Sequence, residues 1–491
     1  MRRLLAPLLA LAALGPVAAT GCGATARAPA ADPAPGSTLR GTWVDPDGDG
    51  TLARGPGQPL RDRTDLAPAA RSGRVLGSLA VLTDVHVRDE ESPARVAFLD
   101  RLGPPFQSTF RPQESLTTQV LTAAVRSINA AGPQDVLDLG DLIDNTQANE
   151  MSWATRVLNG GLVHPDSGAP GYQGPQEASN PDPSYYRPDV DPPRHPGLLA
   201  RAQRSFRSPG LRAPWWAVPG NHDLLVAGEL ARTPETEAIA VGDRAVVAPD
   251  PELAVPRSES ALQGPLLNQL MRLELRYGRT VRVPPDLARR ELSPAEAVAA
   301  LRKAGRRPGG GARMDAAFDL GRRVRVILLD TVRRDRGAGG IVTPAQTRWL
   351  AAQLQAAGDR WVIVASHQPL TNDAGGAGAF ALLDRDPHVL AALDGDTHHN
   401  RIQSRRTSAG GYWLIQTASL ADYPQQARML RVRETAGGGA VLETWMLDTA
   451  PDPLADTARE LAYLDAQGGR PDHEAGTPLD RNVRLFHRPP S

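Results

Sequence analysis

The chain has 491 residues, of which 41% are hydrophobic and 4% aromatic, and its 55 basic and 55 acidic residues give a formal net charge of zero. This length allows one large domain or two ordinary ones, each with a sizeable buried core. The balanced charge excludes the strong overall field expected of a protein dedicated to nucleic acids or acidic surfaces. We therefore expect a globular protein whose chemistry resides in local clusters of side chains.

The first 22 residues, MRRLLAPLLALAALGPVAATGC, have the pattern of an export signal. Two arginines precede an apolar core that is too short and Pro-interrupted to span a membrane convincingly. Cys22, the only cysteine of the chain, follows small residues and resembles the lipobox cysteine of bacterial lipoproteins. We expect an exported protein, lipid-anchored at Cys22 on the outer face of the cytoplasmic membrane. A plain secretory signal is the alternative, and the arginine pair leaves twin-arginine export open.

Residues 23–72 are rich in Ala, Pro, Gly and Asp and are expected to form a tether and an irregular lead-in. From residue 75 onward, apolar runs of strand length alternate with segments of helical periodicity. The expected strands are 75–84, 135–141, 214–221, 323–330, 360–366, 388–395 and 412–419, followed by a hairpin of 427–434 and 440–447. The expected helices are 115–131, a segment 343–357 that begins with a capping box, and 454–466.

Strands separated by helices predict an α/β fold with largely parallel central strands, to which the late hairpin adds antiparallel ones. We place one catalytic domain at 73–450, with long irregular insertions at 151–210 and 224–318, and a C-terminal helix and tail at 451–491. Insertions of this length usually act as lids over a site or lack a fixed structure.

Polar side chains of metal-ligand type follow five of the expected strands. They are Asp84 and His86, Asp141, Asn221 with His222 and Asp223, His367, and Asp396 with His398. Residues two apart on an extended segment point to the same side, so the first pair can bind one ion. Ligand sites of open α/β sheets form at the carboxyl ends of strands. Each motif is weak by itself, but the five together predict one metal centre.

In this order, the motifs D-x-H, G-D-x-x-D, G-N-H-D, a strand-end histidine and G-x-x-H resemble those of the calcineurin-like metallophosphoesterase superfamily. The segments ESPARVAFLDR, PGLLARAQRSFRSPGL and TASLADYPQQAR further resemble a little-characterised actinobacterial secreted branch of that superfamily. The resemblance implies a four-layer αββα sandwich, in which two mixed β-sheets pack face to face between helices, with long loop insertions.

The resemblance also implies roles for the strand-end residues. One divalent ion would be held by Asp84, His86 and His398, and a second by Asn221, His367 and Asp396, with Asp141 bridging the two. The implied enzyme is a phosphomonoesterase or phosphodiesterase in which a dimetal-activated hydroxide attacks phosphorus in line. His222, paired with Asp223, would give a proton to the leaving oxygen. Asp144 and Asn145 would orient the ligands.

Position 396 departs from the superfamily pattern, which has His-x-His where this chain has Asp396-Thr397-His398. Three alternatives are open: the carboxylate binds the second ion, it falls short and water completes the site, or the second site is lost. A third carboxylate ligand would lower the net charge of a dimetal site from about +2 to about +1, favouring Mn²⁺ over Fe²⁺ or Zn²⁺ and an alkaline activity profile. His399 is expected to point away from its neighbour, toward solvent or into a supporting role.

The substrate is left open beyond a phosphoester, and we expect no nucleic-acid-binding patch. Aromatic residues of the first insertion could stack a base or sugar, although packing is their favoured use: Trp153, Tyr172, Tyr185 and Tyr186. Nearby arginines could meet phosphate or simply face solvent: Arg187, Arg194 and Arg201. The alternative to an enzyme is a binding or scaffold lipoprotein on a one-metal or degenerate phosphoesterase fold. His222 and Asp223 argue against that alternative. They are not essential metal ligands, yet both positions still carry residue types that can act in catalysis.

Overall fold

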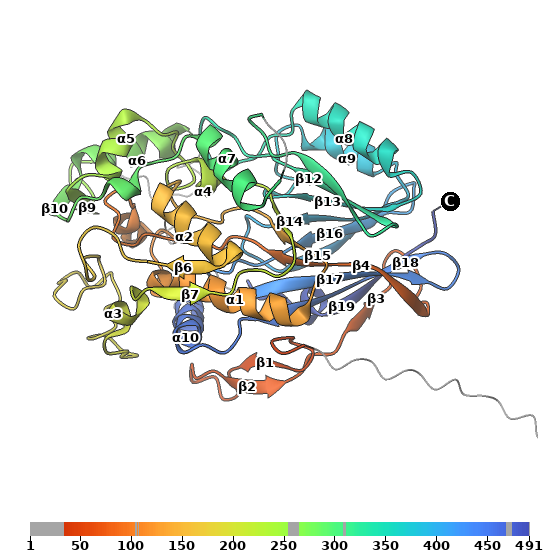
Figure 1. Ribbon diagram of the computed structural model, residues 1–491, viewed down its shortest axis with the longest axis horizontal. Helices are drawn as coiled ribbons and strands as arrows, with labels where there is room; N and C mark the ends of the chain where they lie inside the picture. Colours follow the sequence, from red (N-terminus) through yellow and green to blue (C-terminus); the bar gives the residue numbers. More distant parts are fainter. Residues whose placement is uncertain are drawn as a thin grey trace, which may run out of the picture. The chain divides into compact units, whose positions relative to one another are not determined.

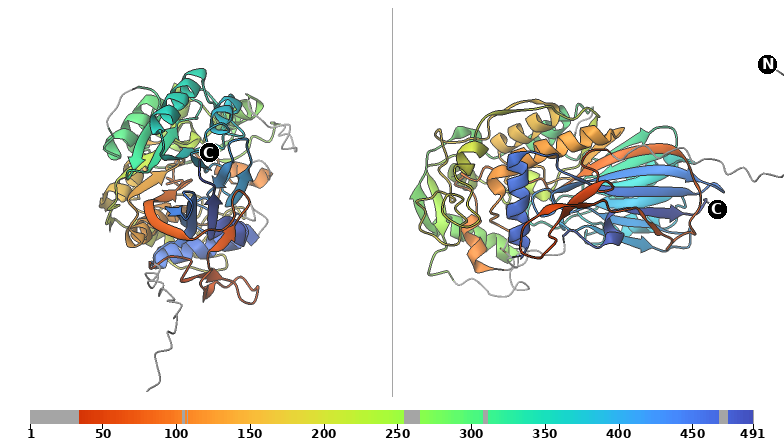
Figure 2. Two further views of the ribbon diagram at one scale, coloured as in Figure 1. Left: turned by 90° about the vertical axis from the view of Figure 1, so that its right-hand side faces the viewer. Right: turned by 90° about the horizontal axis from the view of Figure 1, so that it is seen from below.

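The computed structural model describes residues 34–103, 106, 108–253, 265–307, 311–467 and 474–490. The expected export signal, including Cys22, lies outside the described residues and stays a prediction. Two large mixed sheets pack face to face and helices cover both outer faces, as Figures 1 and 2 show. This arrangement confirms the predicted four-layer sandwich of two mixed sheets flanked by helices.

The first sheet has seven strands in the order β3-β19-β18-β17-β4-β5-β8. Strands β4, β5 and β8 are parallel, and β17 pairs antiparallel with β4. In spatial order the bounds are Arg61–Arg63, Val483–His487, Ala440–Asp448, Gln426–Thr435, Ser72–Leu82, Asp135–Asp138 and Trp215–Ala217. The predicted late hairpin is β17 and β18, and it widens this sheet on the side away from β5.

The second sheet has six strands in the order β11-β12-β13-β14-β16-β15. The four inner strands are parallel and both edge strands are antiparallel. The bounds are Ala316–Leu320, Val324–Leu329, Trp361–Ser366, Val389–Asp394, Tyr412–Gln416 and Arg401–Arg405. The edge strands β11 and β15 were not predicted, because their short and partly polar sequences lack the apolar runs of the inner strands.

Three hydrophobic layers hold the sandwich together. Between the sheets, Val81 and Leu137 pack in the same cluster as Ile363. On the other face of β13, Val362 and Val364 pack against the helices α8 (Pro344–Ala357) and α9 (Gly376–Leu383). Because β13 is buried on both faces, its sequence is a continuous apolar run. Each such side chain contributes roughly 1.5–3 kcal/mol by leaving water.

The outer face of the first sheet is covered by α1 (Thr117–Ala131), α2 (Ala148–Asn159) and α10 (Pro453–Gln467). The predicted capping box of α8 is present: the Thr343 side chain accepts a hydrogen bond from the amide of Gln346, whose side chain accepts one from Thr343. Within the described residues, no helix combines the length and apolar character needed to cross a membrane.

The expectation of an irregular second insertion was wrong. It begins where α4 (Asn221–Leu224) ends and contains α5, β9, α6, β10, η4 and α7, with bounds Pro234–Ala240, Arg244–Ala248, Pro265–Tyr277, Arg279–Arg282, Leu287–Arg289 and Pro294–Ala304. Apolar residues at helical spacing, such as Leu267, Leu270 and Met271, were hidden among many Pro and Arg residues. These three pack in a cluster of their own with η1 (Ala97–Leu102).

The first insertion matches the expectation more closely, because residues 164–197 form no regular helix or strand. The predicted start at residue 151 was wrong, because α2 continues to Asn159, and β6 (Gly161–Val163), α3 (Leu198–Ala202) and β7 (Phe206–Ser208) flank the irregular part. The described part of the lead-in is not wholly irregular, since β1 (Gly41–Val44) pairs with β2 (Ala53–Pro56) and β3 joins the first sheet. Two further short elements lie in the described residues: η2 (Glu114–Leu116) and α11 (Pro478–Arg481).

Two glycines let the ends of β5 and β8 come together. Gly140 has a positive φ of 98°, and a Cβ placed on it would lie 2.5 Å from the Gly220 nitrogen and 2.8 Å from Nδ1 of His367. A Cβ on Gly220 would lie 2.0 Å from Oδ1 of Asp141. Neither position can therefore carry a side chain without separating the strand ends.

Replacing Gly140 with Ala should destabilise the protein by about 3 kcal/mol or more, because backbone atoms must move as well as adopt a strained φ. Gly358→Ala is the matched control: its φ is also positive, at 57°, but nothing lies within 4 Å of the added Cβ. The control should cost only about 1–2 kcal/mol. Urea denaturation measures both, and equal losses would contradict the packing argument.

Candidate metal centre

The predicted ligands gather at one end of the sandwich, where the carboxyl ends of strands from both sheets meet. Asp84 and His86 follow β4, Asp141 follows β5, Asn221 follows β8, His367 follows β13, and Asp396 and His398 follow β14. Five of these seven residues have positive φ: Asp84, His86, Asp141, Asp396 and His398. This conformation costs an ordinary residue roughly 1–3 kcal/mol and persists only where surrounding contacts impose it. Such strain concentrates at functional sites.

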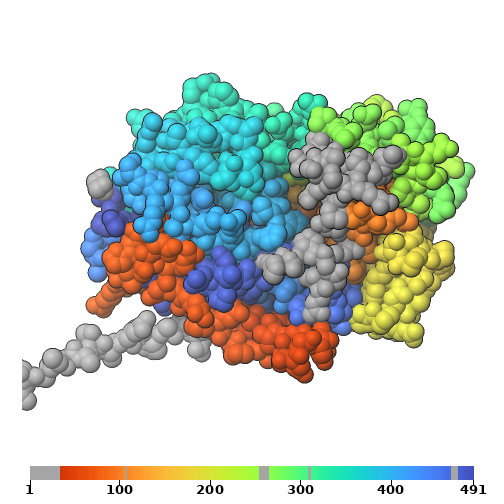
Figure 3. All heavy atoms as spheres, turned by 180° about the vertical axis from the view of Figure 1, so that it is seen from behind, coloured from red at the N-terminus to blue at the C-terminus, as the bar shows by residue number. Residues whose placement is uncertain are grey.

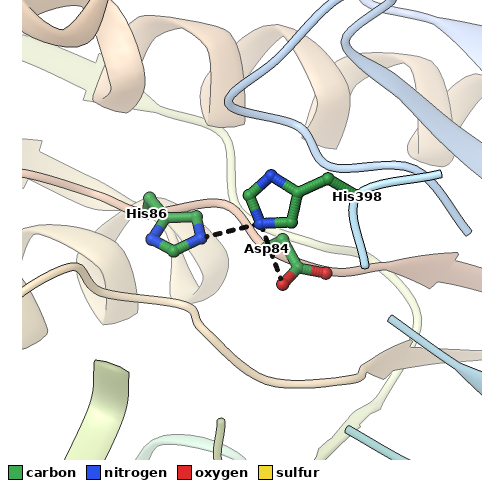
Figure 4. A group of neighbouring side chains, drawn as sticks. All are labelled: Asp84, His86 and His398. Atoms are coloured by element: carbon green, nitrogen blue, oxygen red, sulfur yellow. Dashed lines mark hydrogen bonds and ion pairs between the residues drawn. The ribbon is translucent and has the colours of Figure 1, made fainter. Parts of the chain in front are cut away.

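Asp84, His86 and His398 form one cluster (Figure 4). Nε2 of His398 lies 3.3 Å from Nε2 of His86 and 3.4 Å from Oδ1 of Asp84. One ligand atom of each residue falls within 4.8 Å of the others, so the three could hold a metal ion.

A second cluster surrounds His367. Its Nε2 lies 3.1 Å from Oδ1 of Asn221, 3.3 Å from Oδ2 of Asp141 and 3.6 Å from Oδ1 of Asp396. The same Asp141 oxygen lies 3.8 Å from Nε2 of His86 in the first cluster. The two clusters are therefore adjacent, and Asp141 stands between them.

These spacings fit metal ligation. Two ligands at about 2.0–2.1 Å from a tetrahedral zinc lie about 3.3 Å from each other. The donor atoms of both clusters lie 3.1–3.6 Å apart around His398 and His367. Oδ1 of Asp84 is buried and makes no hydrogen bond, and Nε2 of His398 faces it as a long ion pair at 3.4 Å. A buried carboxylate oxygen without a hydrogen bond is costly, and a divalent cation would satisfy it more closely than this ion pair does.

The protonation states of the histidines differ. Burial lowers the pKa of His86 to about 4, although Asp144 opposes this, so the ring is neutral and ready to ligate near pH 7. Burial also opposes charge on His398, but Asp84 and Asp422 outweigh it and raise its pKa to about 10. The pKa of His367 is likewise raised, because Asp141 outweighs burial. Without metal, two of the three histidines thus hold protons that a cation must displace.

Two carboxylates outside the ligand set orient the histidines. Oδ1 of Asp144 accepts a hydrogen bond from Nδ1 of His86 at 3.0 Å, and Arg88 holds both Asp144 oxygens. Oδ2 of Asp422 accepts one from Nδ1 of His398 at 2.5 Å, and Arg111 holds both Asp422 oxygens. Such pairs fix which ring nitrogen would face a metal ion and would strengthen it as a ligand.

Asp144 was predicted to orient ligands, but Asp422 and the two arginines were missed. Asp422 lies in TASLADYPQQAR, a segment whose resemblance was noted without assigning a role to any residue. Arg111 lies in an irregular stretch that carries no strand or helix pattern. Only the fold brings it within 2.5 Å of a carboxylate 311 residues away along the chain. Asn145 supports a neighbouring loop, since its Oδ1 accepts a hydrogen bond from the amide of Ala227.

The structure corrects the predicted pairing of His222 with Asp223. Both Asp223 oxygens accept backbone hydrogen bonds, from Ile143 at 3.0 Å and Gly220 at 2.8 Å. Nδ1 of His222 instead donates to the carbonyl oxygen of Asp144 at 2.7 Å. The first turn of α4 explains the difference, because a carboxylate at its third residue turns back to cap the helix. Asp223 therefore positions Asn221 and His222 rather than contacting the imidazole.

The two clusters open into a cleft of about 350 Å³. One wall is apolar and is formed by Val96, Phe106, Leu267 and Met271. The arginines that line the cleft are all paired: Arg88 with Asp144, Arg95 with Glu114, and Arg111 with Asp422. His399 lies at the rim and its Nδ1 donates to the carbonyl of Thr397 at 2.5 Å, in keeping with a supporting role.

The residues of the first insertion that were considered for substrate contact do not line this cleft. Trp153 points from α2 into the core, and Tyr185 packs edge-on against Phe110. The hydroxyls of Tyr172 and Tyr186 bond within the insertion. The three arginines make local contacts too, with Asp191, Val190 and Pro196. Packing is therefore the role that the structure shows for the aromatic residues.

No protein-family model and no curated protein matches the chain. Among solved structures, a dimetal phosphatase from Danio rerio is similar, with a TM-score of 0.39 and 13% sequence identity, over 77% of this chain and 100% of that one. The case for a function therefore rests on the geometry of the site, in which clusters of Asp and His indicate divalent-metal binding.

Metal binding should release protons. At pH 7 the metal-free His398 is protonated, because its pKa is about 10, and its Nδ1 proton is engaged by Asp422. A cation that takes Nε2 must displace the other proton, so affinity should rise about tenfold per pH unit for each proton released. Titration calorimetry with Zn²⁺ in buffers of different ionisation enthalpy measures the release. Heats that do not depend on the buffer would contradict it.

The Asp422→Asn variant should weaken Zn²⁺ binding about 10- to 100-fold, because His398 loses the carboxylate that orients it. Asp384→Asn is a matched control, since Asp384 also pairs with an arginine through both oxygens, but away from the clusters. The control should bind Zn²⁺ like the unmodified protein. Equal Zn²⁺ affinities in all three proteins would show that Asp422 does not support metal binding.

Proposed function

We propose that the protein is a metal-dependent phosphoester hydrolase whose centre holds two divalent ions. The observation that carries the proposal is the position of Asp141. One oxygen, Oδ2, lies 3.3 Å from Nε2 of His367 and 3.8 Å from Nε2 of His86, and each histidine belongs to its own cluster. A carboxylate between two ligand sets is the arrangement that a pair of neighbouring cations requires, because it offsets their repulsion.

Asp84, His86 and His398 would hold the first ion, and Asn221, His367 and Asp396 the second, with Asp141 shared. When bound, two such ions supply a hydroxide nucleophile near neutral pH and stabilise charge on the phosphoryl oxygens. Four of the seven ligands offer oxygen, which favours Mn²⁺, with Fe²⁺ and Zn²⁺ as alternatives. The Asp396 oxygen lies near enough to His367 to share an ion with it, which favours a carboxylate ligand over a lost second site.

His222 is suited to protonate the leaving oxygen. Its side chain is 24% exposed at the cleft, and its Nδ1 hydrogen is committed to the Asp144 carbonyl. Nε2 is therefore the nitrogen that can exchange a proton with the leaving oxygen. Gly228 adjoins this ring, and a Cβ there would lie 2.4 Å from Nε2 of His222, so a small residue keeps the nitrogen accessible.

The apolar wall of the cleft and the paired state of its arginines suit a phosphoester with an apolar leaving group, either a monoester or a diester. The export pattern supports a location outside the cytoplasm, with the chain tethered to the membrane through Cys22. The substrate is then a phosphoester available there.

The purified protein with Mn²⁺ should hydrolyse p-nitrophenyl phosphate, bis-p-nitrophenyl phosphate or both. The His222→Ala variant should lose about 10²- to 10⁴-fold in kcat while still binding metal, because only proton donation is removed. His164→Ala is a control, since that histidine bonds Ser205 in the first insertion. Absence of turnover by the metal-loaded protein would count against the enzyme, and unchanged turnover in His222→Ala against the proton donor.

The Asp396→His variant tests the unusual ligand. Replacing a carboxylate by imidazole raises the net charge of the loaded site by about one. The variant should keep two ions, shift its metal preference from Mn²⁺ toward Zn²⁺, and move its activity profile to lower pH. Metal analysis and a pH–rate profile provide the readout. If metal choice and profile both stay unchanged, Asp396 does not ligate.

A further inference from the structure

A second cavity of about 730 Å³ lies on the outer face of the second sheet. Helices α8 and α9 cover β12 and β13 on this face, where Val362 and Val364 are apolar. The floor of the cavity is formed by β14, β16 and β15, beyond those helices, and we call it the outer groove. The side of the molecule that carries this sheet, α8 and α9 is coloured teal to light blue in Figure 3.

The floor of the outer groove is polar, unlike the covered part of the same face. Asp394 on β14 is paired in register with Gln416 on β16, which is paired with Arg401 on β15. Two residues before Gln416 on β16, Leu414 is paired with Gln403 on β15. All five of these side chains line the groove.

Two buried polar atoms at the groove have no hydrogen-bond partner. Asp394 is only 6% exposed, and its Oδ1 has no partner, although its side chain also bonds to Gln416. The hydroxyl oxygen of Thr397 is likewise buried and unpartnered. Leaving such atoms unsatisfied costs roughly 1–3 kcal/mol each. Both atoms have almost no exposed surface, so a ligand recovers this cost by turning the two side chains into the groove.

The chemistry of the lining narrows the occupant. Asp480 offsets the charge of Arg401, so the lining of the groove offers an anion no net positive charge. An ammonium group donates only, so it could not accept a hydrogen bond from the side-chain amide of Gln403. A hydroxyl group both donates and accepts and therefore suits carboxylate and amide together. Leu414 on the floor adds apolar surface against which the C–H face of a sugar ring can pack, whereas Leu370 and Phe380 line the wall but are only 4% and 8% exposed.

We propose that the outer groove is a binding site for a sugar ring. Its volume falls within the range of about 300–1,000 Å³ usual for small-molecule sites. The groove and the metal cleft share two rim residues, Thr397 and His399, on the loop that carries Asp396 and His398. The sugar is therefore either a free saccharide or the sugar part of a phosphorylated substrate, and only the second case rests on the proposed function.

Saturation-transfer NMR with D-glucose and cellobiose, on the metal-free protein, tests the site directly. Ring protons of at least one probe should receive saturation at millimolar concentration. Binding should weaken about tenfold or more in Asp394→Asn and in Gln416→Leu, since each removes a hydrogen-bonding group from the floor. Gln353→Leu is the matched control, because Gln353 lies on α8 and bonds to Arg325 outside the groove.

The inference is overturned if the unmodified protein binds neither sugar, or if both floor variants bind as well as the control. The use of two variants keeps the test valid if one of them does not fold. A further arm compares glucose with glucose 1-phosphate on Zn²⁺-loaded protein. If glucose 1-phosphate binds more tightly than glucose and Gln416→Leu weakens that binding, the groove is a substrate subsite. If the two ligands bind equally well, the groove is a separate saccharide site. Because the first arm needs no metal, failure of the hydrolase proposal would leave its result intact.

Discussion

The carboxylate of Asp141 is the interaction on which the rest of the site depends. It lies between His86 and His367, and its other oxygen accepts a hydrogen bond from the amide of His222 at 2.8 Å. The charge of Asp141 raises the pKa of His367. Burial would raise the pKa of Asp141 itself, but the nearby histidines lower it by more, so the net pKa of Asp141 is lowered. A fully ionised carboxylate thus stands at the junction of both clusters.

The fold around Asp141 is arranged to permit this placement. Glycines at 140 and 220 let two strand ends meet closely, and the capping carboxylate of Asp223 holds the turn that follows. The strained backbone of the ligands is compensated by the three hydrophobic layers of the sandwich, which fix the strand ends from both sheets. The candidate site lies at the carboxyl ends of the strands, because side chains from five strands converge there.

Sequence reasoning reached the architecture and selected the residues that the fold brings together in the two clusters, because both leave local signals. Buried parallel strands such as β13 are continuous apolar runs, and their last residues carry the Asp, Asn and His side chains. It failed where the signal is not local. Arg111 and Asp422 meet only through tertiary structure, and the direction of Asp223 depends on the cap of a four-residue helix. The helices of the second insertion were obscured by composition, and the polar row on β14, β16 and β15 emerges only from the pairing of strands.

The central claim is that two cations share Asp141. Crystals soaked in Mn²⁺ and measured at the manganese absorption edge test it most directly. The account predicts two anomalous peaks about 3.5–4 Å apart, one beside Asp84, His86 and His398 and the other beside Asn221 and His367, with Asp141 contacting both. A single peak, or a pair of peaks that Asp141 does not contact, would contradict it.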